Sequence, residues 1–351
     1  MILISIGLPS RFAEWCDALV ERLAASSFET VEAAALNSLD ELAALVLKTR
    51  ALRIVLCSRQ PAIRLQTAII DSGRPFLVAI GDPRAALRDL VQRQGYDLMA
   101  AIRAVACSCA ALLALTRAPK ALVLSGAAGA DQTKAATAIA EHFGFPIEGD
   151  AIAGILAEVY AAGFMPEDGE DSAWWDGLTV RDRAVVDGAL LPFVAHLASG
   201  SGLEPFVWEP ELFFVDDGST APTPAATARL VDITGRPRFV VYGPYISLPP
   251  GAWSANVVLG FSAETAGMSF MIEVFAGRQL SHTRIEPAAE QIIETNLSFV
   301  IDQAIDQPVQ IRIVNERAAF DGRLALGYVT IGPQPEMRPE ARNRLAAALR
   351  K

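Results

Sequence analysis

A change of hydrophobic period near residue 231 constrains the fold of this chain more than any other feature. From there onward apolar and polar residues alternate, and breakers such as Gly277 and Gly322 separate short runs. Alternation with period two is typical of strands that bury one face. Several short strands at this spacing predict an antiparallel β-sandwich over 229–333. The strand candidates are 238–242, 253–261, 269–275, 297–301, 308–314 and 324–331.

Before this change the pattern is that of an α/β protein. Continuous apolar runs such as 2–6 and 76–80 are typical of strands buried on both faces, and residues at helical spacing follow them. This alternation predicts a doubly wound parallel sheet over 1–200. Its ligand crevice should lie at the carboxyl ends of the strands.

The chain has 351 residues, a length that favours two domains. Residues 201–228 are expected to be a linker, because 216–224 is rich in breakers and lacks core residues. The final segment, 334–351, is expected to be a helical tail that is basic and amphipathic. Its narrow apolar face favours a surface or docking helix over a membrane anchor.

Charge and cysteine content exclude several classes of protein. The net charge of −10 argues against a nucleic-acid binder and against binding to anionic membranes. All four cysteines, Cys16, Cys57, Cys107 and Cys109, lie in the first third, which favours reduced thiols and a cytoplasmic location. The apolar run 104–115 is too short to span a bilayer, so no transmembrane segment is expected.

The loop after the first predicted strand occupies a position that suits a phosphate group. A helix that begins directly after the first strand of a parallel sheet offers its amide N–H groups to an anion. With Pro9 and Trp15 in place, the loop resembles that of the P-loop sulfotransferase-like family, which reads Pro-Lys-Ser-Gly-Thr-Thr-Trp. Ser10 stands at the position of the family's catalytic lysine, and Phe12 stands at the position of its glycine.

These replacements oppose phosphate binding. Ala13 and Glu14 stand where the family has its phosphate-binding threonines. Phe12 should block close approach of the backbone to a phosphate, and Glu14 should repel it. With Ser10 in place of lysine, no cation remains to stabilise developing charge. Arg11 could contact an anion, as any exposed arginine could.

A second match follows the strand 76–80. The family reads Arg-Asp-Pro-Arg here, and its first arginine contacts the 3′-phosphate of the nucleotide donor. Asp82 and Arg84 match, but the first arginine is replaced by Gly81. The serine that the family has eight residues on is Asp89. Asp82 is also expected to cap a helix whose first turn holds the next residue, a proline.

The resemblance covers roughly residues 1–200, with a weaker match at 142–146. It implies a degenerate sulfotransferase-like domain that has lost its donor site, with no catalytic residue, metal or cofactor. The glycine-rich stretch 126–134 does not satisfy GxxxxGK[ST], so an ordinary strand–turn–helix junction is favoured there.

In the β-rich part, aromatic and polar residues are the candidates for ligand contact. Tyr242, Tyr245 and Trp253 cluster around Gly-Pro and Pro-Pro-Gly turns, and Asn315 and Asp321 lie in a later polar loop. Aromatic rings stack on the apolar faces of sugars, and Asn and Asp side chains hydrogen-bond their hydroxyl groups. The segment 243–253 resembles the start of carbohydrate-binding-like β-sandwich modules of bacterial polysaccharide-synthesis proteins. The alternative, that these aromatics are core or corner residues, fits the sequence equally well.

The sequence therefore favours a non-catalytic glycan-binding or adaptor protein in bacterial exopolysaccharide synthesis. Its expected partner is a glycan or a glycan-synthesis enzyme, with no nucleic acid, and a homo-oligomer is compatible with the sequence. The alternative is an active sulfo- or glycosyltransferase with a rearranged donor site. The residues equivalent to the phosphate loop and its neighbour are Pro9, Ser10, Arg11, Trp15, Asp82 and Arg84.

Overall fold

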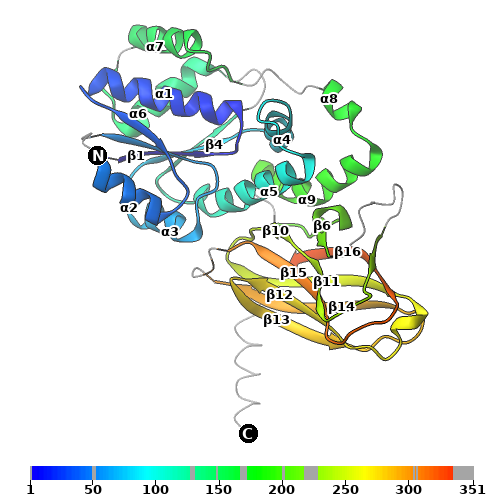
Figure 1. Cartoon of the computed structure of the whole chain (residues 1–351). Coiled ribbons are helices and arrows are strands. Elements are labelled where there is room, and N and C mark those ends of the chain that lie inside the picture. Colours follow the sequence, from blue (N-terminus) through cyan, green and yellow to red (C-terminus); the bar gives the residue numbers. More distant parts are fainter. Residues whose placement is uncertain are drawn as a thin grey trace.

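The structure is a computed structural model, and it describes residues 2–49, 53–126, 131–147, 149–166, 172–199, 202–216, 228–302, 305 and 307–334. Figure 1 shows an α/β domain built from the N-terminal half of the chain and a β-sandwich below it. The tail expected over 334–351 lies outside the described residues from 335 onward, as does the part of the expected linker over 217–227.

The sheet of the α/β domain, sheet A, is parallel, with the strand order β2-β3-β1-β4-β5. Its strands are β1 (Ile2–Gly7), β2 (Glu32–Ala35), β3 (Ile54–Ser58), β4 (Phe76–Ile80) and β5 (Ala121–Ser125). The chain places β2 and β3 on one side of β1 and then β4 and β5 on the other. This reversal of direction creates a crevice at the carboxyl ends of β1 and β4. The predicted doubly wound parallel sheet is confirmed.

Helices cover both faces of sheet A. The helices of this domain are α1 (Arg11–Ser27), α2 (Leu39–Lys48), α3 (Ile63–Asp71), α4 (Pro83–Gln92), α5 (Leu98–Leu115), α6 (Gln132–Phe143), α7 (Gly149–Ala161), α8 (Ser172–Gly177) and α9 (Val180–Ser199). Successive side chains of a buried strand point to opposite faces. Leu3 therefore packs with α1, α6 and α7, whereas Ile4 packs on the side of α3 and α5.

Two of the helix starts expected from the sequence are confirmed. Ser38 caps α2 in a capping box, with its side chain accepting from the Glu41 N–H. Asp82 caps α4 and accepts from the Arg84 N–H at 3.0 Å, with Pro83 in the first turn.

The C-terminal domain consists of two antiparallel sheets, as predicted. Sheet B has the order β14-β11-β16-β6, with β8 also pairing with β16, and sheet C has the order β13-β12-β15-β9-β7, with β10 also pairing with β15. The strands are β6 (Phe206–Trp208), β7 (Phe214–Val215), β8 (Arg229–Asp232), β9 (Arg238–Tyr242), β10 (Pro244–Ile246), β11 (Gly251–Phe261), β12 (Phe270–Ala276), β13 (Arg278–Ile285), β14 (Ile292–Ile301), β15 (Val309–Asn315) and β16 (Arg323–Pro333).

Part of the segment expected as a linker belongs to the sandwich. β6 pairs with β16, and β7 pairs with β9, so each sheet takes one strand from the stretch 206–215. Phe206 and Trp208 are buried because they point into the sandwich core. We therefore propose a domain boundary between α9 and β6.

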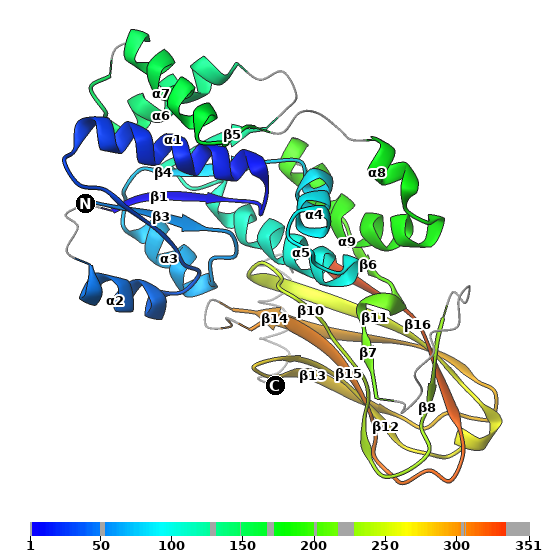
Figure 2. The same cartoon turned by 45° about the horizontal axis from the view of Figure 1, so that its top comes forward.

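The two domains meet at α5 and α9, which lie between sheet A and the sandwich in both views (Figures 1 and 2). The rings of Phe193 on α9 and Phe206 on β6 are 4.5 Å apart. Gly188 allows this approach, because a Cβ there would lie 2.6 Å from the Val207 carbonyl oxygen. Arg103 on α5 donates from Nη2 to the Leu212 carbonyl oxygen at 2.9 Å. The junction is therefore a packed core with directional polar contacts.

Within the part of the chain that the structure describes, α5 is the one helix long and apolar enough to cross a membrane. Most of it, 61%, is buried inside the protein, where it packs between sheet A and the sandwich. Its apolar character is explained by this position in the core.

Candidate functional site

The start of α1 lies at the crevice of sheet A, where the sequence placed the phosphate loop. Ser10 is the N-cap of α1, and its Oγ accepts from the Ala13 N–H at 3.3 Å. The side chain is 1% exposed, so it faces the protein and not a ligand. Gly81 lies close above it, because a Cβ at Gly81 would lie 2.9 Å from Ser10 Oγ. Ser10 thus has a structural role at this helix start.

Phe12 fills the space beside this helix start. It is 4% exposed, and its ring is stacked with that of Trp15 at 5.9 Å between centroids. A Cβ at Gly126, directly after β5, would lie 2.7 Å from the Phe12 ring. The ring therefore occupies the volume between the ends of β1 and β5, where a bound phosphate would need open backbone N–H groups.

The cations near this crevice are paired with carboxylates. Arg11 lies 3.6 Å from the buried Asp89, which also binds Arg93 at 2.7 Å. Arg84 pairs with Asp187 at 2.9 Å and lies over the Trp175 ring. A residue that already balances a carboxylate attracts a second anion weakly. This part of the molecule has the fold that the resemblance implied, and its described arginines Arg11 and Arg84 are both compensated by carboxylates.

Two residues expected to contact a glycan are buried in the sandwich. Trp253 is 3% exposed, and its Nε1 donates to the Pro249 carbonyl oxygen at 3.0 Å. Asn315 is fully buried, and its Oδ1 accepts from the Arg238 N–H at 2.7 Å. Neither side chain can reach a ligand at the surface. The predictions for Trp253 and Asn315 are corrected to structural roles, because both side chains are buried in the sandwich.

The other three expected residues have different positions. Tyr242 and Tyr245 come together in an aromatic cluster at one end of sheet C, with ring centroids 6.5 Å apart. Asp321 is exposed, but its Oδ1 accepts from the adjacent Gly322 N–H. It lies at the opposite end of the sandwich, beyond the end of β15 that carries Asn315.

Phe214, which the sequence interpretation missed, completes this cluster. Its ring is stacked with that of Tyr242 at 5.6 Å and meets Tyr245 edge-on at 5.7 Å. Arg103 from α5 lies 4.5 Å from the Phe214 ring centroid. Phe214 is 39% exposed, so the cluster reaches the surface. No pattern in the short β7 would have revealed this, because its pairing with β9 is a tertiary contact.

A second group of residues extends this cluster across the outer face of sheet C. On β12, Ile272 and Val274 point into the core, so Glu273 and Phe275 point outward. On β15, Arg312 points outward beside them, in register with Glu273. Strand alternation predicts this placement, but the sequence does not show which strands are neighbours. We call this surface the aromatic face; it carries Phe214, Phe239, Tyr242, Tyr245, Phe275 and Arg312.

Arg312 is the centre of the aromatic face. Its guanidinium carbon lies 3.5 Å from the Phe275 ring centroid and 5.4 Å from that of Phe239. Its Nη1 donates to Glu273 Oε1 at 3.3 Å, and its Nε donates to Gln310 Oε1 at 3.0 Å. The side chain of Glu273 is 7% exposed and that of Arg312 is 20% exposed. The guanidinium plane is therefore held in one orientation and still reaches solvent.

His282 lies at the edge of this face. It lies on β13 opposite Glu273, and Gln279 Nε2 is 2.8 Å from its Nδ1. Among the described residues, no group of three or more His, Cys, Asp or Glu side chains could hold a metal ion.

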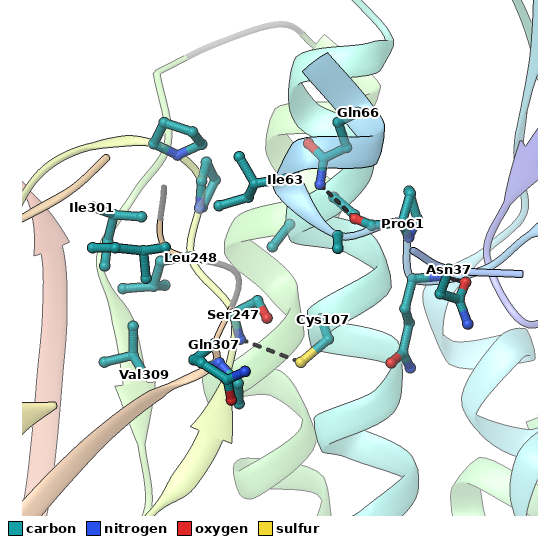
Figure 3. A pocket seen from close by; sticks show the side chains of 18 of the residues that line it. Asn37, Pro61, Ile63, Gln66, Cys107, Ser247, Leu248, Ile301, Gln307 and Val309 are labelled. Atoms are coloured by element: carbon teal, nitrogen blue, oxygen red, sulfur yellow. Dashed lines mark hydrogen bonds between the residues drawn. The ribbon is translucent and has the colours of Figure 1, made fainter. Parts of the chain in front are cut away.

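A cleft of about 390 Å³ lies where the two domains meet (Figure 3). One wall comes from the loops after β2 and β3, and the other comes from the β10–β11 and β14–β15 loops of the sandwich. Helix α5 forms its floor with Cys107, Ala110 and Ala111. Tyr245 belongs both to this cleft and to the aromatic cluster.

Comparisons with known proteins find similar folds for each half of the chain. No family model matches the sequence, and no curated protein matches it. The structure of mouse sulfotransferase SULT7A1 complexed with PAP matches the N-terminal part, with 10% identity over 56% of this chain and 84% of that one, at a TM-score of 0.40.

Carbohydrate-binding modules match the C-terminal sandwich. The xylan-binding module CBM15 has 18% identity over 37% of this chain and 98% of its own, at a TM-score of 0.28. The C-terminal CBM6 of LamC from Zobellia galactanivorans has 11% identity over 36% of this chain and 98% of its own, at a TM-score of 0.26. At these values the likenesses concern the fold alone.

Proposed function

We propose that this chain is a non-catalytic glycan-binding protein whose aromatic face binds the saccharide. The observation that carries the proposal is Arg312, which is held against Phe275 by Glu273 and Gln310 while its Nη2 group makes no hydrogen bond to described residues. A guanidinium fixed in this way offers donors to sugar hydroxyl groups without losing side-chain freedom on binding.

The neighbouring aromatics supply the apolar half of the interaction. Phe239 is 45% exposed, so it offers ring surface for a pyranose to stack on, and Phe214, which is 39% exposed, adds apolar surface in the same sheet. They lie on β9 and β7 of the same sheet, beside the polar groups of β15 and β12. This combination of stacking surface and oriented polar groups is what saccharide recognition requires.

The charge at the centre of the face favours an uncharged glycan. Arg312 and Glu273 form an ion pair, so the pair adds no net charge. A carboxylate or sulfate on the sugar would have to compete with Glu273 for the guanidinium, at a cost in desolvation. We propose neutral polysaccharide as the ligand class.

The α/β domain is proposed to be inactive as a transferase. Ser10 stands at the lysine position as a buried helix cap, and Phe12 fills the space beside it. These features motivate the non-catalytic assignment and leave the domain available for contact with a partner. A setting in bacterial exopolysaccharide synthesis, with a glycan-synthesis enzyme as partner, is the finer form of the proposal and rests on the sequence resemblance.

A glycan array probed with the full chain tests the proposal. We expect binding to one class of neutral polysaccharide, and weaker binding of Arg312→Ala to the same spots. Arg22→Ala is the control, because Arg22 is an exposed residue of α1 in the other domain. Binding to no glycan on the array, or equal binding by Arg312→Ala, would overturn the proposal.

A further inference from the structure

We propose that the cleft between the two domains is a second binding site, for one uncharged sugar unit. From the proposed function this inference takes only the class of ligand, a saccharide. The cleft is distinct from the aromatic face, and only Tyr245 belongs to both.

The position of the cleft is that of a ligand site in an α/β protein. Asn37 follows β2 and Gln60 follows β3, so these residues lie at the carboxyl ends of two parallel strands. Ligands of open α/β sheets bind outside these ends. At β1 and β5 the Phe12 ring fills the corresponding space, so the open part of this edge lies at β2 and β3.

The described lining of the cleft is largely apolar, with uncharged polar groups between the apolar side chains. Among the residues that the structure describes there, none is an Asp, Glu, Lys, Arg or His. Leu248, Ile301 and Val309 form an apolar wall on the sandwich side, as Figure 3 shows. Side-chain amides come from both domains, with Asn37 and Gln66 on one side and Gln307 on the other. A phosphorylated or sulfated ligand would find no cation among these described residues, whereas a neutral polyol finds apolar contact and hydrogen-bonding partners.

Two of the three amides, those of Asn37 and Gln66, are oriented by hydrogen bonds within the protein and keep free hydrogen-bonding groups. Asn37 Oδ1 accepts from Ser58 Oγ at 2.8 Å and from the Gln60 N–H at 2.9 Å, which leaves Nδ2 as a donor. Gln66 Nε2 donates to the Pro61 carbonyl oxygen at 2.7 Å, which leaves Oε1 as an acceptor. Gln307 makes no hydrogen bond to the residues that the structure describes. A sugar hydroxyl both donates and accepts, so it matches this mixed set.

The volume and walls suit a small ligand. About 390 Å³ lies in the range of small-molecule sites, roughly 300 to 1,000 Å³. Because residues of both domains line the cleft, a bound sugar would contact the α/β domain and the sandwich at once. The α/β domain would then contribute to recognition of the sugar, although it lacks a site for a nucleotide donor.

Cys107 provides a reporter inside the cleft. Its Sγ accepts from the Ser247 N–H at 3.2 Å and donates to the Tyr245 carbonyl oxygen at 3.6 Å. Burial raises the pKa of this thiol, so its alkylation is slow and depends on access through the cleft. Cys16 and Cys109 are buried and serve as internal references.

The test is iodoacetamide labelling of the full chain with and without glucose, galactose, mannose or xylose, read for each cysteine by fragment-ion mass spectrometry. Calorimetry identifies a sugar that binds and gives its Kd. At a concentration about ten times the Kd, we expect that sugar to slow labelling of Cys107 about tenfold, because about one chain in eleven remains free. Glucose 6-phosphate and glucuronate should give no protection.

Matched variants locate the effect. Gln307→Ala should weaken sugar binding by about fivefold to tenfold, as expected for one lost hydrogen bond, and Gln307→Glu should weaken it at least as much. Gln92→Ala, at an exposed position of α4, is the control and should bind as the wild type does. Phe239→Ala should leave the protection of Cys107 unchanged, because Phe239 lies outside the cleft.

The outcomes separate this inference from the proposed function. The inference is overturned if none of the neutral sugars binds, or if a sugar that binds does not slow the labelling of Cys107. It is also overturned if Gln307→Ala binds that sugar as tightly as the wild type does, or if glucose 6-phosphate protects Cys107 as well as the neutral sugar does. Polysaccharide binding that depends on Phe239 would still support the aromatic face in these cases. The converse outcome is that a sugar protects Cys107 while Phe239→Ala binds polysaccharide as tightly as the wild type does. That result would support the cleft as a sugar site and overturn the aromatic face as the polysaccharide site.

Discussion

The guanidinium carbon of Arg312 lies 3.5 Å from the centroid of the Phe275 ring, on the outer face of sheet C. Its Nη1 and Nε donate to Glu273 and Gln310, and these two hydrogen bonds hold the guanidinium against the ring. This contact turns two strand residues into one rigid surface, with polar donors at its edge and Phe239 beside it. The account of glycan binding depends on this surface.

Replacing Arg312 with lysine should separate geometry from charge. Lysine keeps the positive charge but cannot lie flat on Phe275 or bind Glu273 and Gln310 through separate nitrogens. We expect Arg312→Lys to lose about tenfold in glycan affinity, measured by calorimetry with the best array ligand. Arg22→Lys should leave the affinity unchanged, because Arg22 forms an exposed ion pair with Glu158 in the other domain. An unchanged affinity in Arg312→Lys would show that charge alone suffices.

Trp253 should affect stability and not binding. Trp253→Phe removes the hydrogen bond to the Pro249 carbonyl oxygen and leaves a space in the core, which together should cost about 1–3 kcal/mol of the free energy of unfolding. Urea unfolding measures this loss, and calorimetry on the folded variant should give the wild-type affinity. A loss of affinity without a loss of stability would restore Trp253 as a ligand contact.

The crevice of sheet A should not bind a nucleotide donor. With the Phe12 ring against Gly126 and Ser10 as a buried cap, we expect no heat of binding when adenosine 3′,5′-bisphosphate is titrated into the chain. Ser10→Lys should not create binding, because the ring still fills the space. Micromolar binding to the wild type would contradict this prediction and would favour the alternative of a rearranged transferase.

Glu316 lies at the end of the sandwich far from α5, and its carboxyl group should make the stability of the protein depend on pH. Its pKa is held below its ordinary value by a hydrogen bond from Ser269 and by Arg284. A carboxyl whose folded pKa is depressed stabilises the fold above its unfolded pKa, and that contribution is lost as the pH falls through the folded value. Between about pH 6 and about pH 3, the wild type should therefore lose more in Tm than Glu316→Gln does. Equal losses would show that the pair contributes nothing.

The sequence predicted the class of both folds because the hydrophobic period of each strand or helix is a local property of the sequence. Buried parallel strands such as 2–6 and alternating strands such as 253–261 show their periods directly. The sequence could not distinguish Trp253, which points into the core, from Tyr242, which lies near the surface, because both lie beside similar turns. It also missed Phe214 and Arg312, whose importance depends on which strands are neighbours. Pairing of β7 with β9 and of β12 with β15 is a long-range property that composition and period do not encode.

The most direct measurement of the central claim compares two aromatic residues that have the same exposed fraction on opposite sheets. Phe239 on sheet C and Tyr328 on sheet B are each 45% exposed. Calorimetry with the best array glycan should show that Phe239→Ala loses about tenfold in affinity, as expected for one lost stacking contact of about 1.5 kcal/mol, while Tyr328→Ala binds as the wild type does. A loss in Tyr328→Ala together with an unchanged Phe239→Ala would place the glycan on the other sheet and contradict the account.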